Sequence, residues 1–162
     1  MIGVAPIASM PVGVLQTAAA ATDTDPLREA FKAELGTIAA GAGIPWVHKD
    51  VENVFAAADG ATSFLALEFD GSPPFEQRTW GAPRNNLYRE DGNVWVRVVA
   101  PIGSGSAAAG YARAIAAAFT ERRFTRADGR SIRTRAGAPS HSRLGGRWIE
   151  SVPVAYRVDN LA

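Results

Sequence analysis

Apolar residues recur at helical spacing in a first stretch of the chain, just after residue 26. Asp25 is a suitable capping residue, and Pro26 suits the first helical position because its missing N–H has no partner there in any case. The apolar positions that follow are Leu27, Phe31, Leu35 and Ile38. This spacing predicts an amphipathic helix that ends at Gly41 and Gly43.

A second helical stretch is rich in alanine and follows a loop that contains two glycines. Its apolar positions are Ala108, Tyr111, Ile115, Ala118 and Phe119. We expect Ser106 to cap its N-terminus. We also expect Arg122 and Arg123 to lie in its last turn, where the helix dipole favours positive charge.

Strands are predicted where apolar and polar residues alternate. There are five such segments: 62–69, 75–81, 93–100, 131–135 and 147–158. The pair Asp91-Gly92 predicts a turn before the third of them. Pro153 lacks a backbone donor, so it predicts an edge position or a bulge for the last strand. Residues 136–146, rich in glycine, serine and proline, predict a loop.

Two helices and about five strands joined by short turns indicate an α+β fold. We expect a mainly antiparallel sheet with both helices packed on one face, formed as a single domain by residues 26–162. Residues 1–25 are apolar and alanine-rich, and we interpret them as a flexible arm. The other face of the sheet would display Trp95, Arg97, Ile149 and Arg157. An uncovered face of this kind usually contacts a partner subunit.

Composition restricts the chemistry that the chain can perform. The 162 residues contain no cysteine, which excludes disulfides, thiol nucleophiles and thiolate metal sites. No uninterrupted apolar run reaches the roughly 18 residues of a membrane helix, so we expect no membrane partner. Residues 1–108 hold 7 Lys/Arg against 12 Asp/Glu, and residues 109–162 hold 10 against 4, so the two parts carry −5 and +6. This polarity is compatible with head-to-tail self-association or with an anionic partner.

Three segments resemble chemical sites and are better explained without chemistry. The loop Gly103-Ser104-Gly105 lies between a strand and a helix, but it lacks the third glycine of a dinucleotide fingerprint and the lysine of a phosphate loop. His48 and Asp50 lack further ligands at regular spacing for a metal. Ser140-His141-Ser142 does not place a hydroxyl in line with an imidazole. We therefore predict no catalytic residue, no metal site and no cofactor.

Arginines are concentrated in one part of the chain. The cluster consists of Arg122, Arg123, Arg126, Arg130, Arg133 and Arg135. Such a cluster can contact phosphate backbones without reading sequence. A solvated strand face or an acidic neighbouring subunit explains it equally well.

The order of these parts resembles the tail terminator family of long-tailed bacteriophages, the lambda-type tail completion ring proteins. The resemblance covers roughly residues 26–160. It rests on the opening helix around residues 31–35, Ile44-Pro45-Trp46-Val47, Pro73-Pro74, the segment 92–98, the glycine loop 101–105 leading to the helix that closes on Phe119, and Val152-Pro153-Val154.

The resemblance implies a structural subunit that is not an enzyme and forms a homo-oligomeric ring, expected to be a hexamer. The ring would bind the tail tube protein, stop its polymerisation and join it to the head-tail connector protein. It would be a component of the virion's tail and neck region, assembled in the host cytoplasm, and genomic DNA would pass through its lumen without sequence-specific contact. Candidate residues for the subunit interface are Trp80, Arg84, Tyr88, Trp95, Arg97, Arg133 and Arg135.

Other functions remain open at this point. Another neck or tail component, such as a head completion, connector or tube subunit, is the nearest alternative. A nucleotide-dependent enzyme would use the glycine loop, and a small nucleic-acid binder would use the arginine cluster.

Overall fold

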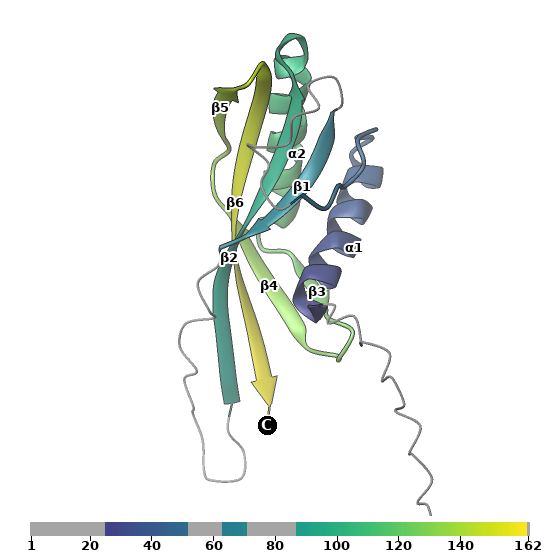
Figure 1. The fold of residues 1–162 in the computed structure, drawn as a ribbon. Coiled ribbons are helices and arrows are strands. Elements are labelled where there is room, and N and C mark those ends of the chain that lie inside the picture. The colour runs from purple at the N-terminus through teal and green to yellow at the C-terminus, as the bar shows by residue number, and fades with distance from the viewer. Residues whose placement is uncertain (1–24, 52–62, 71–86, 162) are drawn as a thin grey trace, which may run out of the picture.

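A pair of long antiparallel strands forms the centre of the computed structural model, which describes residues 25–51, 63–70 and 87–161. Strand β2 (Leu87–Pro101) pairs with β6 (Arg147–Leu161) along its whole length, from Leu87 opposite Leu161 to Pro101 opposite Arg147. Figure 1 shows these two strands side by side along most of the described part of the chain, with the other elements attached to them.

The remaining strands extend this pair into one antiparallel sheet. β1 (Phe64–Phe69) pairs with β2, while β4 (Ser131–Ala136) pairs with β6 and carries β3 (Arg123–Thr125) on its other side. The order is therefore β1-β2-β6-β4-β3, and β5 (Ser140–Leu144) pairs with the first part of β6. The α+β prediction is confirmed, and the described part of the chain holds six strands.

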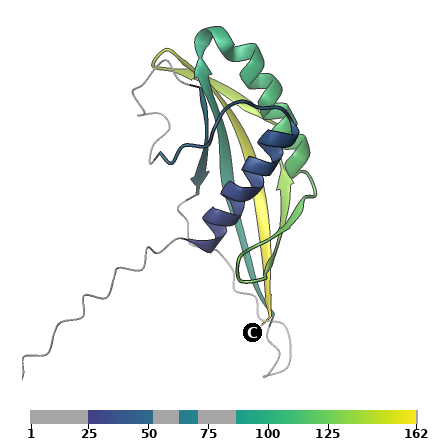
Figure 2. The same ribbon diagram turned by 90° about the vertical axis from the view of Figure 1, so that its right-hand side faces the viewer.

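Both helices cover the same face of this sheet (Figures 1 and 2). α1 (Pro26–Gly41) begins as predicted, because the Asp25 side chain accepts a hydrogen bond from the Leu27 N–H at 3.0 Å. α2 (Gly105–Phe119) packs its alanines against β6 and β2. The ring of Phe31, fully buried, lies at the centre of the core, within 5.1–6.0 Å of the rings of Phe69, Phe119, Phe124 and Tyr156.

The predicted turn at Asp91-Gly92 is wrong, because both residues lie inside β2. Gly92 stands opposite Tyr156, and a Cβ at position 92 would lie only 2.4 Å from the Tyr156 hydroxyl oxygen. The glycine is therefore needed for the close approach of a ring and not for a turn.

The start and end of the second helix also differ from the prediction. A short 3-10 helix, η1 (Ile102–Ser104), precedes α2, so Ser104 and not Ser106 occupies the N-cap position. The helix ends at Phe119 and Thr120 is already extended, so Arg122 and Arg123 lie beyond the last turn. Arg123 instead begins β3, a strand that the sequence pattern did not predict.

Pro153 occupies an inner strand, contrary to the predicted edge position, and the register of β2 with β6 contains no bulge. The pairing of β4 reaches Val154 and that of β5 reaches Ser151, so Pro153 lies where β6 changes partner. Its carbonyl accepts a hydrogen bond from the Gly137 N–H at 2.8 Å. Its nitrogen faces the same gap, where no ladder donor is required.

One further prediction is corrected, and two others concern residues outside the described ranges. The expected loop at 136–146 contains β5. The expected strand at 75–81 and residues 1–24 of the arm lie outside the described residues.

Candidate functional site

The face of the sheet that points away from both helices, called the helix-free face below, is the candidate functional site. Part of it is covered: Phe64, Ala66, Val99 and Ile149 are each at most 2% exposed and form a small second core, with Val51 packed against them. The expectation that Ile149 is displayed on an open surface is therefore wrong.

Trp95 and Arg97 lie further along the same face and contact each other. The Arg97 guanidinium carbon lies 4.9 Å from the centre of the Trp95 ring, which is a cation–π distance. Arg97 also donates to Glu68 at 2.9 Å and to the Ser151 hydroxyl at 2.5 Å. These contacts hold three neighbouring strands in register, so Arg97 stabilises the sheet whatever else it binds.

Arg147 is a buried cation at the start of β6. The residue is only 5% exposed, and its guanidinium lies over the Phe64 ring at 5.6 Å. Neither terminal nitrogen has a hydrogen-bond partner within the described part of the chain. Burial of a charged group in this way carries a free-energy cost.

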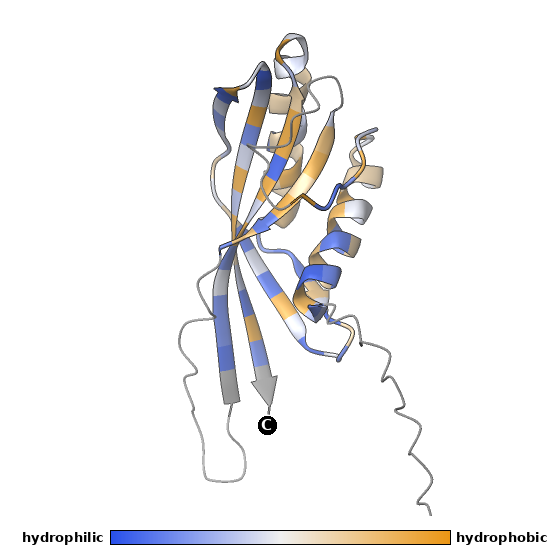
Figure 3. Cartoon of the chain, viewed as in Figure 1, coloured by the Kyte–Doolittle hydropathy of each residue, from blue (hydrophilic) through white to orange (hydrophobic). Residues whose placement is uncertain are grey.

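The other end of the helix-free face carries four exposed arginines, called the arginine face below: Arg123, Arg133, Arg135 and Arg157. Arg123 lies directly opposite Arg133, and Arg133 lies directly opposite Arg157, so one row of like charges crosses β3, β4 and β6. Arg135 lies two residues along β4 on the same face. Figure 3 shows hydrophilic bands along this end of β2, β4 and β6.

Only Arg157 among these four has an acidic partner within the described residues. It donates to Asp91 at 2.7 Å, and this hydrogen bond raises the pKa of Arg157. Three cationic side chains on this face are thus directed to solvent.

The remaining arginines of the cluster between residues 122 and 135 are paired with carboxylates. Arg122 donates to Glu34 of α1 at 2.5 Å. Arg126 forms an ion pair with Asp128, which also lies 3.4 Å from Arg130. The hydrogen bond from Arg126 lowers the pKa of Asp128 to about 2. Within the described residues, the structure therefore divides the cluster into arginines that have a carboxylate partner and three that have none: Arg123, Arg133 and Arg135. It also brings Arg157, which lies far along the chain, beside Arg133.

The structure brings four of the seven predicted interface residues onto one face of the sheet. Trp95 and Arg97 on β2, and Arg133 and Arg135 on β4, all lie on the helix-free face. Tyr88 lies in β2, but its side chain is not among those described. Trp80 and Arg84 lie outside the described residues. The role of all seven residues in a subunit interface stays a prediction.

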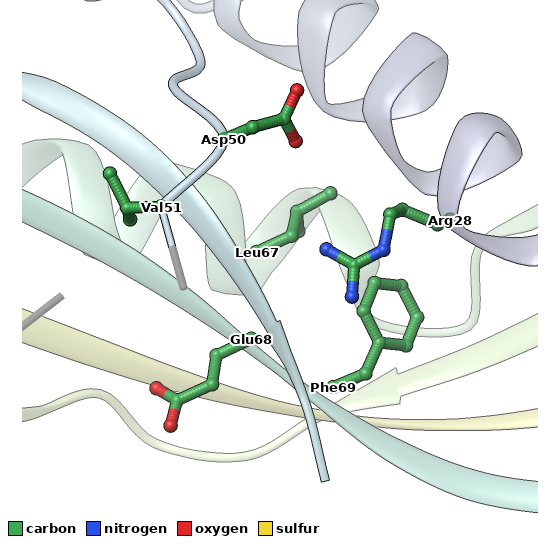
Figure 4. Close-up of a pocket in the computed structure, with 6 residues that line it drawn as sticks. All are labelled: Arg28, Asp50, Val51, Leu67, Glu68 and Phe69. Atoms are coloured by element: carbon green, nitrogen blue, oxygen red, sulfur yellow. The ribbon is translucent and has the colours of Figure 1, made fainter. Parts of the chain in front are cut away.

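A hollow of about 330 Å³ lies beside β1, lined by Arg28, Asp50, Val51, Leu67, Glu68 and Phe69. Figure 4 shows the Arg28 guanidinium beside the Phe69 ring, 4.9 Å from its centre. Asp50 is bound by Lys32 at 2.9 Å, and this hydrogen bond lowers the pKa of Asp50. The charged side chains that line the hollow therefore already contact other residues of the same chain.

The glycine loop and the segments around His48 and His141, considered above as chemical sites, make packing and backbone contacts in the fold. A Cβ at Gly105 would lie 2.7 Å from Cδ2 of Trp148, so an indole ring occupies the space beside the glycine loop. His141 stacks on the same ring at 5.1 Å. His48 forms an isolated bridge with Leu65 at the edge of β1, and burial lowers its pKa. In the described part of the chain, no three histidine or carboxylate side chains gather as a metal site, and no helix is long and apolar enough to span a membrane.

Comparison with known proteins identifies a solved structure with a similar fold. No family model matches the chain, and no curated protein matches it. A solved chain from a structure described as "Virion of native gene transfer agent (GTA) particle" matches with a TM-score of 0.55 and 14% identity, over 83% of this chain and 95% of that chain. A second solved chain matches with a TM-score of 0.46 and 23% identity, over 85% of this chain and 96% of that chain. The first likeness shows that this α+β fold occurs in a component of a virion particle.

Proposed function

We propose that this protein is a structural subunit of a phage-like virion. The observation that carries the proposal is the likeness to the gene transfer agent chain, because the match spans 95% of that chain and not merely a common fragment. The order of sequence motifs leads to the same class of protein independently. In this role the chain performs no catalysis and holds no cofactor.

Within that class, we assign it to the tail terminator ring. Its partners would be further copies of itself, the tail tube protein and the head-tail connector protein. A ring subunit needs two different surfaces that meet head to tail, because a heterologous interface closes only when unlike patches are complementary. The polarity of charge along the chain supports such an arrangement.

The test is the mass of the assembled species. Native mass spectrometry and negative-stain images of the purified chain should show closed rings, either alone or after addition of the tail tube protein of the same particle. Persistent monomer that does not bind the tube protein would overturn the assignment. Unlimited self-polymerisation into tubes would instead identify a tube subunit, the nearest alternative.

A further inference from the structure

The arginine face holds four exposed cations at positions set by the sheet, and within the described residues only Arg157 has an acidic partner, Asp91. Directly opposite residues on neighbouring antiparallel strands have Cβ atoms about 5 Å apart, and like charges at such positions are destabilising. Arg123, Arg133 and Arg157 form a row of this kind across three strands. An anion bound over the row would remove the repulsion.

The partner must be anionic, and the surroundings of the arginines indicate its class. Neighbouring residues on this part of the face are Asn93, Thr125, Ser131 and Ala155, which are small or polar. Two carboxylates also lie here, Asp91 and Asp159, and they form ion pairs with Arg157 and Arg89. Protein interfaces usually contain an apolar core with aromatic anchors, and none of these neighbouring residues provides one. A phosphate backbone needs no apolar contact, and guanidinium groups bind phosphate through two parallel hydrogen bonds.

The shape of the site indicates contact without base readout. The arginines project from a sheet, and among the described residues no helix lies on this face to enter a major groove. A duplex carries one phosphate per 3.4 Å of each strand, so several phosphates lie within reach of four long side chains.

From this geometry, we infer that the arginine face binds the phosphate groups of double-stranded DNA independently of base sequence. In the proposed ring this places Arg123, Arg133, Arg135 and Arg157 toward the lumen. The position in the lumen rests on the proposed function, whereas the binding itself can be measured on the free chain.

The experiment compares two double variants with the same net charge. Arg133→Ala/Arg135→Ala removes two charges from the arginine face. Arg113→Ala/Arg130→Ala removes two exposed charges elsewhere, one on α2 and one paired with Asp128. Fluorescence anisotropy with a labelled DNA duplex of random sequence gives the affinity at about 25 mM salt and its dependence on salt. Circular dichroism confirms that both variants fold.

We expect the face variant to bind at least about tenfold more weakly, with a salt slope reduced by about 1.8, because each lost phosphate contact removes about 0.9. The control variant should stay within about threefold of the wild type. Equal losses in both variants, or no binding by the wild type, would overturn the inference. It would also be overturned if poly-glutamate displaced the duplex at equal charge concentration, or if the face variant lost self-association, since either result would assign the face to a protein partner. Intact rings with no DNA affinity would refute only this inference, while DNA binding by a persistent monomer would refute only the ring.

Discussion

Tyr156 of β6 lies directly opposite Gly92 of β2, and its ring occupies the space where a side chain at position 92 would begin. The hydroxyl oxygen would be 2.4 Å, and Cζ 2.5 Å, from a Cβ built there. Tyr156 also contacts Phe31 in the core, with ring centres 5.6 Å apart. The absence of one side chain on β2 thus lets an aromatic ring of β6 reach the first helix.

The first prediction concerns this contact. Gly92→Ala should lower the free energy of unfolding by about 1–3 kcal/mol, because the added methyl group overpacks the site. Urea denaturation measures the change. Gly110→Ala is the control: nothing lies within 4 Å of its Cβ position, so it should stabilise α2 by about 0.5–1 kcal/mol.

The pKa of Tyr156 provides a second readout for the same variant. Burial raises the pKa of this phenol to about 12. If Gly92→Ala displaces the ring toward solvent, its pKa should fall toward the ordinary value of 10.0 in a phenolate absorbance titration. An unchanged pKa together with unchanged stability would show that the ring does not lie over Gly92.

The second prediction tests the role of the glycine loop. Gly105→Ala should destabilise the fold by about 1–3 kcal/mol, because the new methyl group would collide with the Trp148 ring at 2.7 Å. Gly103→Ala should be nearly neutral, since nothing lies within 4 Å of its Cβ position. Thermal or urea unfolding distinguishes the two. Equal tolerance of both substitutions would contradict the packing role assigned to Gly105.

The third prediction concerns the buried guanidinium of Arg147. Arg147→Met should keep the packing against Phe64 while removing a buried charge, so it should raise the free energy of unfolding by about 1 kcal/mol. Arg143→Met is a matched control, because Arg143 is exposed and lies over the Trp148 ring at 4.6 Å. It should change stability by less than about 0.5 kcal/mol. A loss of more than about 2 kcal/mol in Arg147→Met would mean that the guanidinium has an acceptor.

The fourth prediction concerns pH. The Arg126 hydrogen bond depresses the folded-state pKa of Asp128 from 3.8 to about 2, so the stabilisation from this pair is present above pH 3.8 and is lost as the pH falls toward 2. Asp128→Asn should therefore be less stable than the wild type at pH 7, by under about 1 kcal/mol because the pair is solvent-screened. The difference should vanish near pH 2. Urea denaturation of both proteins across this range measures it, and a difference independent of pH would contradict the assignment.

Much of the fold could be predicted because its signals are local. The start of α1 depends on Asp25 and Pro26 and on the spacing of its own apolar residues, and the strand at Phe64–Phe69 depends on its own alternation. β5 was missed since its residues are mostly exposed and it is held by backbone pairing with β6, which leaves no apolar pattern. Gly92 was assigned to a turn because the ring that explains it comes from the other end of the chain.

The candidate site was predictable only in part for the same reason. The sequence shows the arginines between residues 122 and 135, but it does not show which of them are neutralised. That depends on tertiary partners such as Glu34 for Arg122. It does not show either that β6 brings Arg157 into the same row as Arg133.

We propose that this chain ends a tail tube as a ring. Electron microscopy of the tail tube protein polymerising with and without the purified chain tests it most directly. We predict shorter tubes in its presence, each with a single added ring at one end. Tubes of unchanged length with bare ends, at concentrations where the chain is folded, would contradict the claim.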